Sequence, residues 1–511
     1  MKNALAIIFI IVLSAFLYTL TLRGVSGNPD INTVKAEYEG TSNPLELSPE
    51  RGRFAHVMSL GENGSYELGP ILGKLAYPDV GYSDGKFYSF FAPGISYMAT
   101  PFYLWGKQYG LAQVFTFGFV SIMSILALIF IFKVAREVFK LPLWASILAP
   151  VIFAFGSSAW SYSGTLYQHH PTVFFLISGF YWAWRYKQGG KFSWLWACLV
   201  WAGYALSIAI DYPNAVLMLP VMVYLLVSAF SITDSLDSIK INFRSSLIAT
   251  FIIFAIITGT HLYHNKIHFG GWTKLSGELV SYKTLVERNL DPDAPETKII
   301  LQELGHKKSA IAFFSEFRIV RGFNTLMFAS DRGLFVFAPI FILGILGLIY
   351  ALKKEINMEL LTLLGIIIAN IFLYSSWGDP WGGWAYGPRY LILSMSILSI
   401  FTANFLVTGS HLLMKRMIAL LLFLYSSAIG LLGAITTNAV PPSVEAVGLG
   451  VSSNYMFNVP FLENGQTSSF IYRIYLHNYL SLTDYFFYIF GLVALVFIYL
   501  VFVMPKFKHG N

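Results

Sequence analysis

The chain has 511 residues, of which 56% are apolar and 12% charged, with a mean hydropathy of +0.61 and a formal net charge of +7. Soluble proteins carry about 25% charged residues, so this sequence lacks the charged surface that a soluble globule of its size needs. The same numbers exclude a disordered chain, a coiled coil and a collagen-like fibre. The composition therefore predicts an integral membrane protein.

The amino-terminal apolar run extends to Leu22, which is long for a signal-peptide core, and no small-residue cleavage site follows it. We therefore expect a retained first span. The single cysteine, Cys198, lies inside an apolar run, so no intrachain disulfide is expected. The basic residues stand in short groups between apolar runs, where they fix membrane orientation, and no nucleic-acid partner is predicted.

Twelve runs are long and apolar enough to cross a hydrocarbon core of ~30 Å as helices of about 20 residues. They are 4–22, 111–132, 141–158, 168–184, 193–210, 213–230, 246–262, 333–352, 358–374, 391–409, 417–435 and 484–504. The run Ile95–Trp105 is shorter and contains Pro101, so we expect an interfacial helix there; a crossing would make it the thirteenth span. The predicted fold class is an all-α polytopic membrane protein with a long structured first outward loop.

Lysines and arginines in short loops predict which side of the membrane each loop faces. One alternate set of connections holds nearly all of the positive charge in short loops: Lys133, Arg136, Lys140, Arg185, Lys187, Lys191, Lys240, Arg244, Lys353, Lys354, Lys415, Arg416, Lys506 and Lys508. This set and both termini are expected in the cytoplasm. The outward side then has three long segments, 23–110, 263–332 and 436–483, and three short ones, at 159–170, 211–214 and 375–390. We expect the chemistry on this outer face.

The first outward loop contains carboxylates placed for proton transfer. Glu50 stands near the start of a predicted helix that runs to about Leu60, within reach of lipid headgroups, where a carboxylate can deprotonate a hydroxyl. The alternative is that Glu50 only caps the amino end of the helix, where the helix dipole favours negative charge. The residues alone leave both interpretations open. Asp79, Lys86 and Tyr88 follow in the same loop.

The short outward segment 375–390 is rich in aromatic residues. Trp381, Trp384 and Tyr386 offer flat amphipathic faces that stack on sugar rings or lie at headgroup level. Arg389 is the lone cation in a short outward loop and is suited to binding a phosphate with paired hydrogen bonds. The alternative is an aromatic belt in which Arg389 reaches lipid headgroups.

Smaller signals lie on the same face. Asp211 occupies a tight corner close to the hydrocarbon, where an acid is costly and hints at function, unless it only stabilises the turn. His169 and His170 are adjacent, and His268 follows the seventh span. An adjacent pair is a weak metal signal because metal-binding helices space their ligands at i and i+4, so no metal ligands are predicted; dependence on a divalent cation is left open.

The segment Pro49-Glu50-Arg51-Gly52-Arg53-Phe54-Ala55 resembles a motif of the GT-C class of integral membrane glycosyltransferases. The resemblance is to the branch that contains the protein O-mannosyltransferases and the lipid A aminoarabinose transferases. In that branch an acidic residue, often in Pro-Asp-Glu, precedes Arg-Tyr-Ala. Glu50 falls on the catalytic acid, Arg53 on the arginine and Phe54 on the tyrosine. The sequence departs from the motif because Glu replaces Asp and Arg51 replaces the second acid.

Further segments, in the same order, resemble uncharacterised prokaryotic membrane proteins of this superfamily. They are Asp79, Gly85, Tyr88-Ser89 and Ala92-Pro93-Gly94; His169 or His170; Asp211-Tyr212-Pro213; His268-Phe269-Gly270; Arg332 to Phe335 with Pro339; Trp381–Gly383; and Gly387–Tyr390. The matches span about residues 50–390. Each motif is short, and their order carries more weight than any one of them.

The resemblance implies a GT-C-like fold and transfer of a hexosyl or pentosyl group from a polyprenyl-phosphate donor to a lipid, glycan or protein acceptor. The reaction would take place at the outer face of the plasma membrane, and the family expectation is inversion. Glu50, with Asp79 as the next candidate, would activate the acceptor. Donor and phosphate binding is assigned to Arg53, Arg389, Lys86, His169 and His268, and sugar or acceptor binding to Tyr88, Trp381, Trp384, Tyr386 and Asp211. Residues 1–435 would form the catalytic module, and 436–511 an outward loop with the last transmembrane helix.

The chief alternative is a transporter or flippase of a lipid-linked glycan. Transport sites lie near the bilayer midplane, on broken helices or intramembrane charges, often within inverted repeats. This chain has hardly any charge inside its spans and places its polar residues at one surface, which favours an enzyme.

A lipid-linked oligosaccharide polymerase has a late outward loop rich in arginine, whereas the loop 436–483 holds only one arginine, Arg473. A non-catalytic receptor predicts no turnover. The enzyme interpretation requires Glu50 and Arg389 to meet at a shared cavity.

Overall fold

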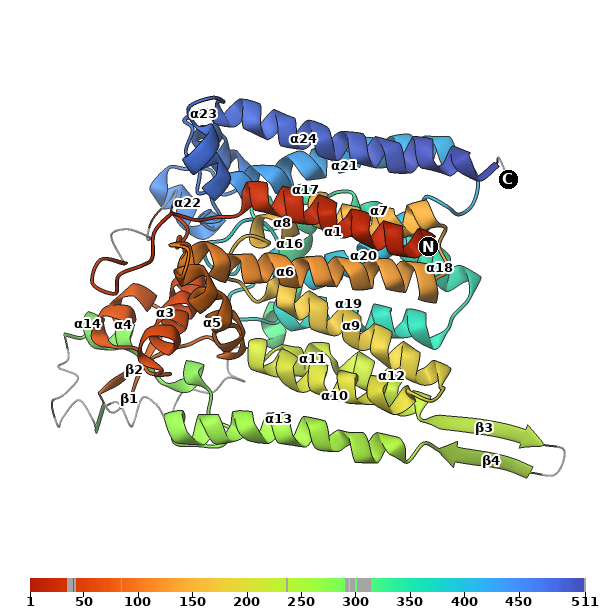
Figure 1. Cartoon of the computed structure of the whole chain (residues 1–511), viewed down its shortest axis with the longest axis horizontal. Coiled ribbons are helices and arrows are strands. Elements are labelled where there is room, and N and C mark those ends of the chain that lie inside the picture. The colour runs from red at the N-terminus through yellow and green to blue at the C-terminus, as the bar shows by residue number, and fades with distance from the viewer. Residues whose placement is uncertain are drawn as a thin grey trace.

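The structure, a computed structural model, describes residues 1–509 except 35–39, 41–42, 84, 236–237, 290–293, 295–298 and 301–313. Its main body is a layered bundle of helices that run roughly parallel to one another (Figure 1). Among the described residues, seven helices are long and apolar enough to cross a membrane. They belong to α1 (Lys2–Thr21), α6 (Ala112–Lys133), α10 (Ser193–Ile210), α13 (Ser246–Phe269), α19 (Met358–Ser375), α21 (Leu412–Ile435) and α24 (Leu482–Ile498). The chain is a multi-pass membrane protein.

The other predicted spans are also helical. One of them, α9 (His169–Gln188), is long but less apolar, and the rest are shorter or interrupted. They correspond to α7 (Leu143–Phe155), α9 (His169–Gln188), the pair α11 (Asn214–Leu217) and α12 (Leu219–Ser228), the pair α17 (Leu334–Phe337) and α18 (Phe341–Lys354), and α20 (Ile392–Phe405). Pro339 separates α17 from α18, because proline lacks the N–H that would continue a helix. The total of twelve crossings stays a prediction.

The outward segments gather at one end of the bundle. The first contains α3 (Ser48–Asn63), α4 (Pro70–Ala76) and α5 (Gly94–Lys107), the last of which covers the expected interfacial run. α5 packs against α3 and α6 at this end of the bundle (Figure 1). The segment 263–332, only partly within the described residues, adds α14 (Tyr282–Glu287) and α16 (Ile319–Phe328). The late segment contains α22 (Ser443–Leu449) and α23 (Val459–Glu463), and a short α8 (Ala159–Tyr162) precedes α9.

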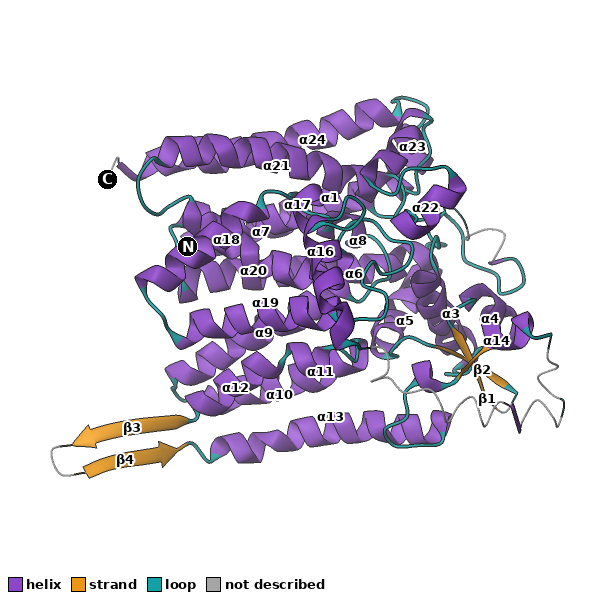
Figure 2. Cartoon of the chain, turned by 180° about the vertical axis from the view of Figure 1, so that it is seen from behind, coloured by secondary structure: helices purple, strands orange, loops and turns teal. Residues whose placement is uncertain are grey.

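The expectation of an all-α chain is wrong in detail, because two small antiparallel sheets are present. In the first, β1 (Val80–Ser83) lies between β2 (Lys86–Ser89) and β5 (Val280–Ser281). Since Gly81 pairs with Ser281, this sheet joins the first outward segment to the chain that follows α13. The second sheet is a hairpin of β3 (Phe230–Ser235) and β4 (Ser238–Phe243) that extends from the opposite end of the bundle (Figure 2).

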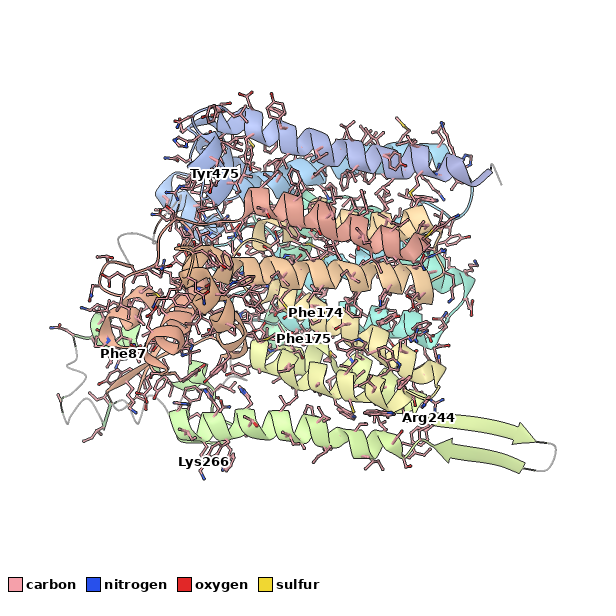
Figure 3. All side chains as sticks on the ribbon, in the orientation of Figure 1. Phe87, Phe174, Phe175, Arg244, Lys266 and Tyr475 are labelled. Atoms are coloured by element: carbon pink, nitrogen blue, oxygen red, sulfur yellow. The ribbon has the colours of Figure 1, made fainter. Side chains whose placement is uncertain are left out.

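The two chain termini lie at the hairpin end, away from the outward segments (Figures 1 and 2). Arg244, predicted on the same side as the termini, lies at that end of α13, and Lys266 lies at the other end (Figure 3). α13 runs on to Phe269 instead of stopping near residue 262, and Gly270, with φ +80°, terminates it in a left-handed conformation. His268, expected in a loop, is therefore on a helix.

Candidate active site

The Glu50 side chain is held at the start of α3 by backbone N–H groups of the residues that precede the helix. Its Oε2 atom accepts the N–H groups of Glu46 and Leu47, each at 3.1 Å, so the carboxylate caps the helix. Its Oε1 atom is buried and has no hydrogen-bond partner among the described residues. The two sequence interpretations of Glu50 are therefore compatible, because one oxygen closes the helix and the other has no partner among the described residues.

Glu46 is a buried acid that the sequence interpretation missed. It forms an ion pair with Arg23, and both side chains are almost completely buried. Its Oε2 also accepts the N–H of Asn438 at 2.8 Å, and Arg23 donates to the carbonyl of Gly433 at 3.1 Å. This network ties the first outward segment to the end of α1 and to the late segment. The signal in the sequence was an arginine directly after the first span.

The surroundings of Glu50 disfavour its ionised form. Burial, followed by the negative charge of Glu46, raises the pKa of Glu50 to about 8, against the opposing effect of Arg23. A carboxyl group with a pKa near working pH can accept and return a proton, which is the property a general base needs.

Arg53 lies three residues after Glu50, on the same face of α3. Its Nη1 donates to the carbonyl of Pro49 at 3.1 Å and its Nη2 to Oε1 of Gln168 at 2.7 Å, while its buried Nε has no partner among the described residues. Burial lowers the pKa of Arg53 to about 10, and the negative charge of Asp211 opposes this shift, so the guanidinium stays positive at neutral pH.

Arg389, from the segment 375–390, lies near the same tyrosine as Arg53, although the two arginines are far apart in the sequence. Its guanidinium carbon lies 5.5 Å from the ring centre of Tyr167, and that of Arg53 lies 5.9 Å from the same ring. Nη2 of Arg389 donates to the carbonyl of Gly382 at 2.5 Å, whereas Nε and Nη1 are buried and unpartnered in the described part of the chain. Glu50, Arg53 and Arg389 all act on the pKa of Tyr167, which burial raises. Two distant segments thus converge on one phenol ring.

His169 and Asp211 complete this cluster, which we call the Tyr167 centre (Glu50, Arg53, Tyr167, His169, Asp211 and Arg389). The His169 ring stacks on Tyr167 with centroids 5.7 Å apart, and its Nε2 is buried without a partner in the described chain. Burial raises the pKa of Asp211 to about 6, against the charges of Arg53 and Arg389 and a hydrogen bond from Gln168. Tyr167 was not among the predicted residues, although it lies two positions before His169.

Several predicted residues lie elsewhere. Asp79 accepts a hydrogen bond from the hydroxyl of Ser48 and so holds the beginning of α3. Lys86 pairs with Glu67 at 2.5 Å on a partly exposed surface. Tyr88 and His268 contact each other, with ring centres 6.2 Å apart. Both of these rings also contact Tyr66, with ring centres 6.0 and 4.6 Å from it, and form a second group around that residue.

The aromatic residues of segment 375–390 have structural partners. Tyr386 is fully buried, and its hydroxyl donates to the carbonyl of Ile429 at 2.6 Å. Trp384 donates to Glu445 at 2.6 Å, and the carbonyl of Trp381 accepts from Arg332 at 2.8 Å. Their predicted contact with sugar stays a prediction.

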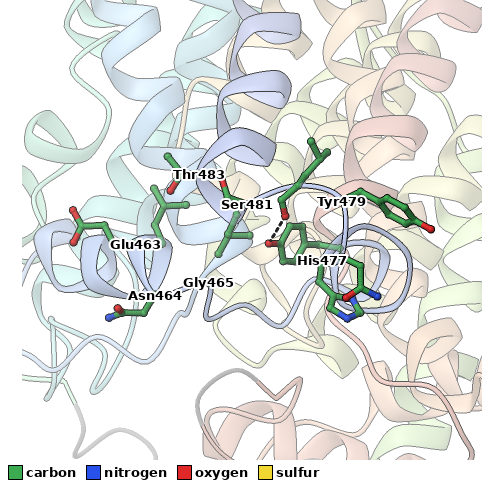
Figure 4. Close-up of a pocket in the computed structure, with 12 residues that line it drawn as sticks. Glu463, Asn464, Gly465, His477, Tyr479, Ser481 and Thr483 are labelled. Atoms are coloured by element: carbon green, nitrogen blue, oxygen red, sulfur yellow. Dashed lines mark hydrogen bonds between the residues drawn. The ribbon is translucent and has the colours of Figure 1, made fainter.

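A surface hollow of about 500 Å³ lies away from these residues, between α23 and the start of α24 (Figure 4). Its lining includes Glu463, Asn464, His477, Tyr479 and Ser481, and none of the predicted site residues. The open cavity expected between Glu50 and Arg389 stays a prediction. No group of three or more histidine, cysteine, aspartate or glutamate side chains that could hold a metal ion occurs in the described part of the chain.

No protein-family model and no curated protein matches this sequence. Among solved structures, the chain is similar to the archaeal oligosaccharyltransferase AglB from Archaeoglobus fulgidus, in complex with an inhibitory peptide and a dolichol-phosphate. The identity is 13% and the TM-score 0.46, and the alignment covers 93% of this chain and 60% of AglB. This chain therefore spans less than two thirds of that protein.

The chain is also similar to ArnT from Cupriavidus metallidurans bound to undecaprenyl phosphate, at 14% identity and a TM-score of 0.49, with 98% of this chain and 78% of ArnT covered. The corresponding values for apo ArnT are 13%, 0.45, 97% and 77%. AglB and ArnT are GT-C glycosyltransferases, the class that the sequence motifs resemble. All three TM-scores are below 0.5, so the roles of individual residues are argued from this chain's own geometry.

Proposed function

We propose that this protein is a glycosyltransferase that moves a sugar from a polyprenyl-phosphate donor to an acceptor hydroxyl at the outer face of the membrane. The observation that carries the proposal is the set of buried polar atoms around Tyr167 that have no hydrogen-bond partner among the residues that the structure describes. They are Oε1 of Glu50, Nε of Arg53, the Tyr167 hydroxyl, Nε2 of His169, and Nε and Nη1 of Arg389. Leaving such groups without partners costs about 1–3 kcal/mol each, so the arrangement favours a polar ligand.

The two arginines suit the phosphate of the donor. Guanidinium groups bind phosphate through short, charge-assisted hydrogen bonds, and a buried environment strengthens them. Arg53 and Arg389 approach one ring from different segments and keep unpartnered N–H groups. Together they would stabilise the negative charge that develops on the phosphate as it leaves.

Glu50 would act as the general base. The acceptor oxygen forms a bond to the anomeric carbon while the bond from that carbon to the phosphate oxygen breaks, and the phosphate keeps the electron pair. Oε1 of Glu50 takes the acceptor proton, through a transition state with oxocarbenium character at the sugar. The resemblance to GT-C glycosyltransferases makes inversion at the anomeric carbon the expected course.

The location of the reaction is part of the proposal. Helix α3, which carries Glu50 and Arg53, lies at the bundle end away from the termini (Figure 1), and the basic short loops predict cytoplasmic termini in the plasma membrane. The donor would then be used at the outer face. Whether the sugar is a hexose or a pentose, and whether the acceptor is a lipid, a glycan or a protein, are questions for substrate panels.

Release of polyprenyl phosphate from a labelled sugar donor tests the proposal. Purified protein in detergent, where no gradient exists, should release the carrier lipid only when an acceptor is present, and Glu50→Gln should abolish most of this release. A flippase moves lipid-linked glycan between leaflets of a vesicle without breaking the sugar–phosphate bond. Translocation with no release of carrier lipid from any donor would overturn the transferase assignment.

A further inference from the structure

A second group of aromatic and imidazole rings surrounds Tyr66, between the first outward segment and α13. Tyr66 is 4% exposed, and its ring centre lies 4.2 Å from that of His56, 4.2 Å from His264 and 4.6 Å from His268. The ring of Tyr97 stacks parallel to it at 6.1 Å. We call these five residues the Tyr66 centre. It joins α3, α5 and α13, three elements that are separate in sequence.

The Tyr66 centre contains buried polar atoms that have no role in the proposed transfer step at the Tyr167 centre. The Tyr66 hydroxyl and both ring nitrogens of His264 have no hydrogen-bond partner among the described residues. One turn earlier on α13, Nε2 of His261 is also buried and has no hydrogen-bond partner among the described residues. Ring packing alone satisfies none of these donors and acceptors, so a ligand that brings hydroxyl groups would stabilise them.

The centre is neutral, unlike the pair of arginines. His56 lies with Nε2 2.6 Å from the carbonyl oxygen of Tyr66, and burial lowers the pKa of His56 to about 4, so its ring is uncharged at neutral pH. The charged side chains nearest to it, Lys86 and Glu67, pair with each other at its rim. A phosphate finds no cation to bind inside this centre, whereas sugar hydroxyls find donors, acceptors and aromatic faces.

The Tyr66 centre lies close enough to Arg53 and Arg389 for a single substrate molecule to contact both centres. Glu50, Arg53 and His56 follow one another at three-residue intervals on α3, and each step advances about 4.5 Å along the helix. At the corner after α10, Asp211 belongs to the Tyr167 centre, while the ring of the next residue, Tyr212, lies 6.0 Å from that of His261. The two centres are therefore neighbours, as phosphate and sugar are in a glycosyl phosphate.

We propose that the Tyr66 centre binds the hydroxyl groups of the sugar ring that the donor carries, with the Tyr66 hydroxyl and the His264 imidazole as its hydrogen-bonding groups. This inference rests on the proposed glycosyltransferase function and adds the residues that distinguish a glycosylated carrier from the bare carrier lipid. It assigns Tyr66, His56 and His264 a role in choosing the sugar.

The test measures how much the sugar increases the affinity of the protein for the carrier lipid. The affinities of the full-length protein are measured for undecaprenyl phosphate alone and for its mannosyl, glucosyl and galactosyl forms. At least one sugar should tighten binding, and Tyr66→Phe should reduce that gain about 2- to 10-fold, the range expected for one hydrogen bond. The affinity for undecaprenyl phosphate alone should not change. Phenylalanine keeps the ring contacts, so the fold is preserved.

Tyr263→Phe is the matched control, because Tyr263 precedes His264 on α13 but is 57% exposed and contacts Trp272. His264→Leu should reproduce the effect of Tyr66→Phe. A sugar-dependent gain that both variants retain would overturn the inference, as would equal affinity of the wild-type protein for bare and glycosylated lipids. A raised KM for the acceptor alone would overturn the assignment to the donor sugar. Failure of the proposed glycosyltransferase function would give a different result. In that case Arg389→Ala would bind bare undecaprenyl phosphate with the affinity of the wild-type protein.

Discussion

The Tyr167 centre and the Tyr66 centre use the same helix in different ways. Both draw residues from one face of α3, and both contain buried polar atoms without partners in the described chain. Around Tyr167 these atoms include those of two guanidiniums and a carboxyl group besides a phenol and an imidazole, whereas in the described part of the Tyr66 centre they belong to a phenol and an imidazole alone. The difference indicates a division of labour, in which charge binds the leaving phosphate and neutral rings bind the sugar. Each variant below asks whether the two centres can be separated.

The largest effect is expected from Glu50→Gln. The amide keeps the size of the side chain and can still accept the N–H groups of Glu46 and Leu47, so α3 remains capped, but it cannot take a proton. General-base assistance is worth about 10²–10⁴-fold, and kcat should fall by that factor while donor affinity stays near wild type. Glu62→Gln, on the same helix but paired with Lys107 at 2.6 Å, is the control. Full activity of Glu50→Gln would remove the base from the mechanism.

Arg389→Ala should mainly weaken binding of the carrier phosphate. Hydrogen bonds to charged groups contribute about 1.5–3 kcal/mol, so affinity for undecaprenyl phosphate should fall about 10- to 100-fold. The sugar-dependent gain should persist, because the Tyr66 centre is intact. Arg321→Ala serves as the control, since Arg321 is exposed and lies 5.8 Å from the ring centre of Trp381, away from Tyr167. Equal losses in the two variants would indicate a general loss of positive charge rather than a phosphate site.

The pH dependence of turnover should report the state of Glu50. A base is active when ionised, and the pKa of Glu50 is raised to about 8, so kcat should be low under acidic conditions and rise with pH through about 8. Glu46→Gln removes a negative charge that contributes to this shift, so the midpoint should move to lower pH. The variant also breaks a buried ion pair with Arg23 and should be less stable, and its profile is therefore measured below its unfolding temperature. An unchanged midpoint would mean that another group controls the profile.

The sequence predicted most of the fold and named five of the six residues of the Tyr167 centre, for identifiable reasons. The apolar runs marked every long helix, because a membrane span needs sustained hydrophobicity. Glu50 was visible as an acid near the start of a predicted helix, Arg53 through the motif resemblance, and Arg389 as the lone cation in a short outward loop. Glu46 and Arg23 were missed, because their pairing depends on segments that meet only after folding. Tyr167 was missed because a single tyrosine in an aromatic-rich chain carries no signal until two guanidiniums are seen beside its ring.

His264 illustrates the same limit. It was placed in a loop after a span predicted to end near residue 262, whereas α13 continues to Phe269. Only that extra length puts His261, His264 and His268 at helical spacing, with the ring of His264 against Tyr66. The hydrophobic pattern could not show the extension, because the last turns of α13 leave the apolar run and depend on contacts with the first outward segment.

The smallest effect is expected from Tyr386→Phe, which separates sugar binding from packing. The sequence assigned Tyr386 to sugar contact, yet its ring is fully buried and its hydroxyl donates to the carbonyl of Ile429. Removing that hydroxyl leaves a buried carbonyl with one partner fewer, so stability should fall by about 1 kcal/mol, seen as a lower melting temperature in detergent. The gain in affinity that the sugar provides should equal that of the wild-type protein, in contrast to Tyr66→Phe. A lost sugar-dependent gain with an unchanged melting temperature would move the sugar from Tyr66 towards Tyr386, and the two centres would no longer be distinct.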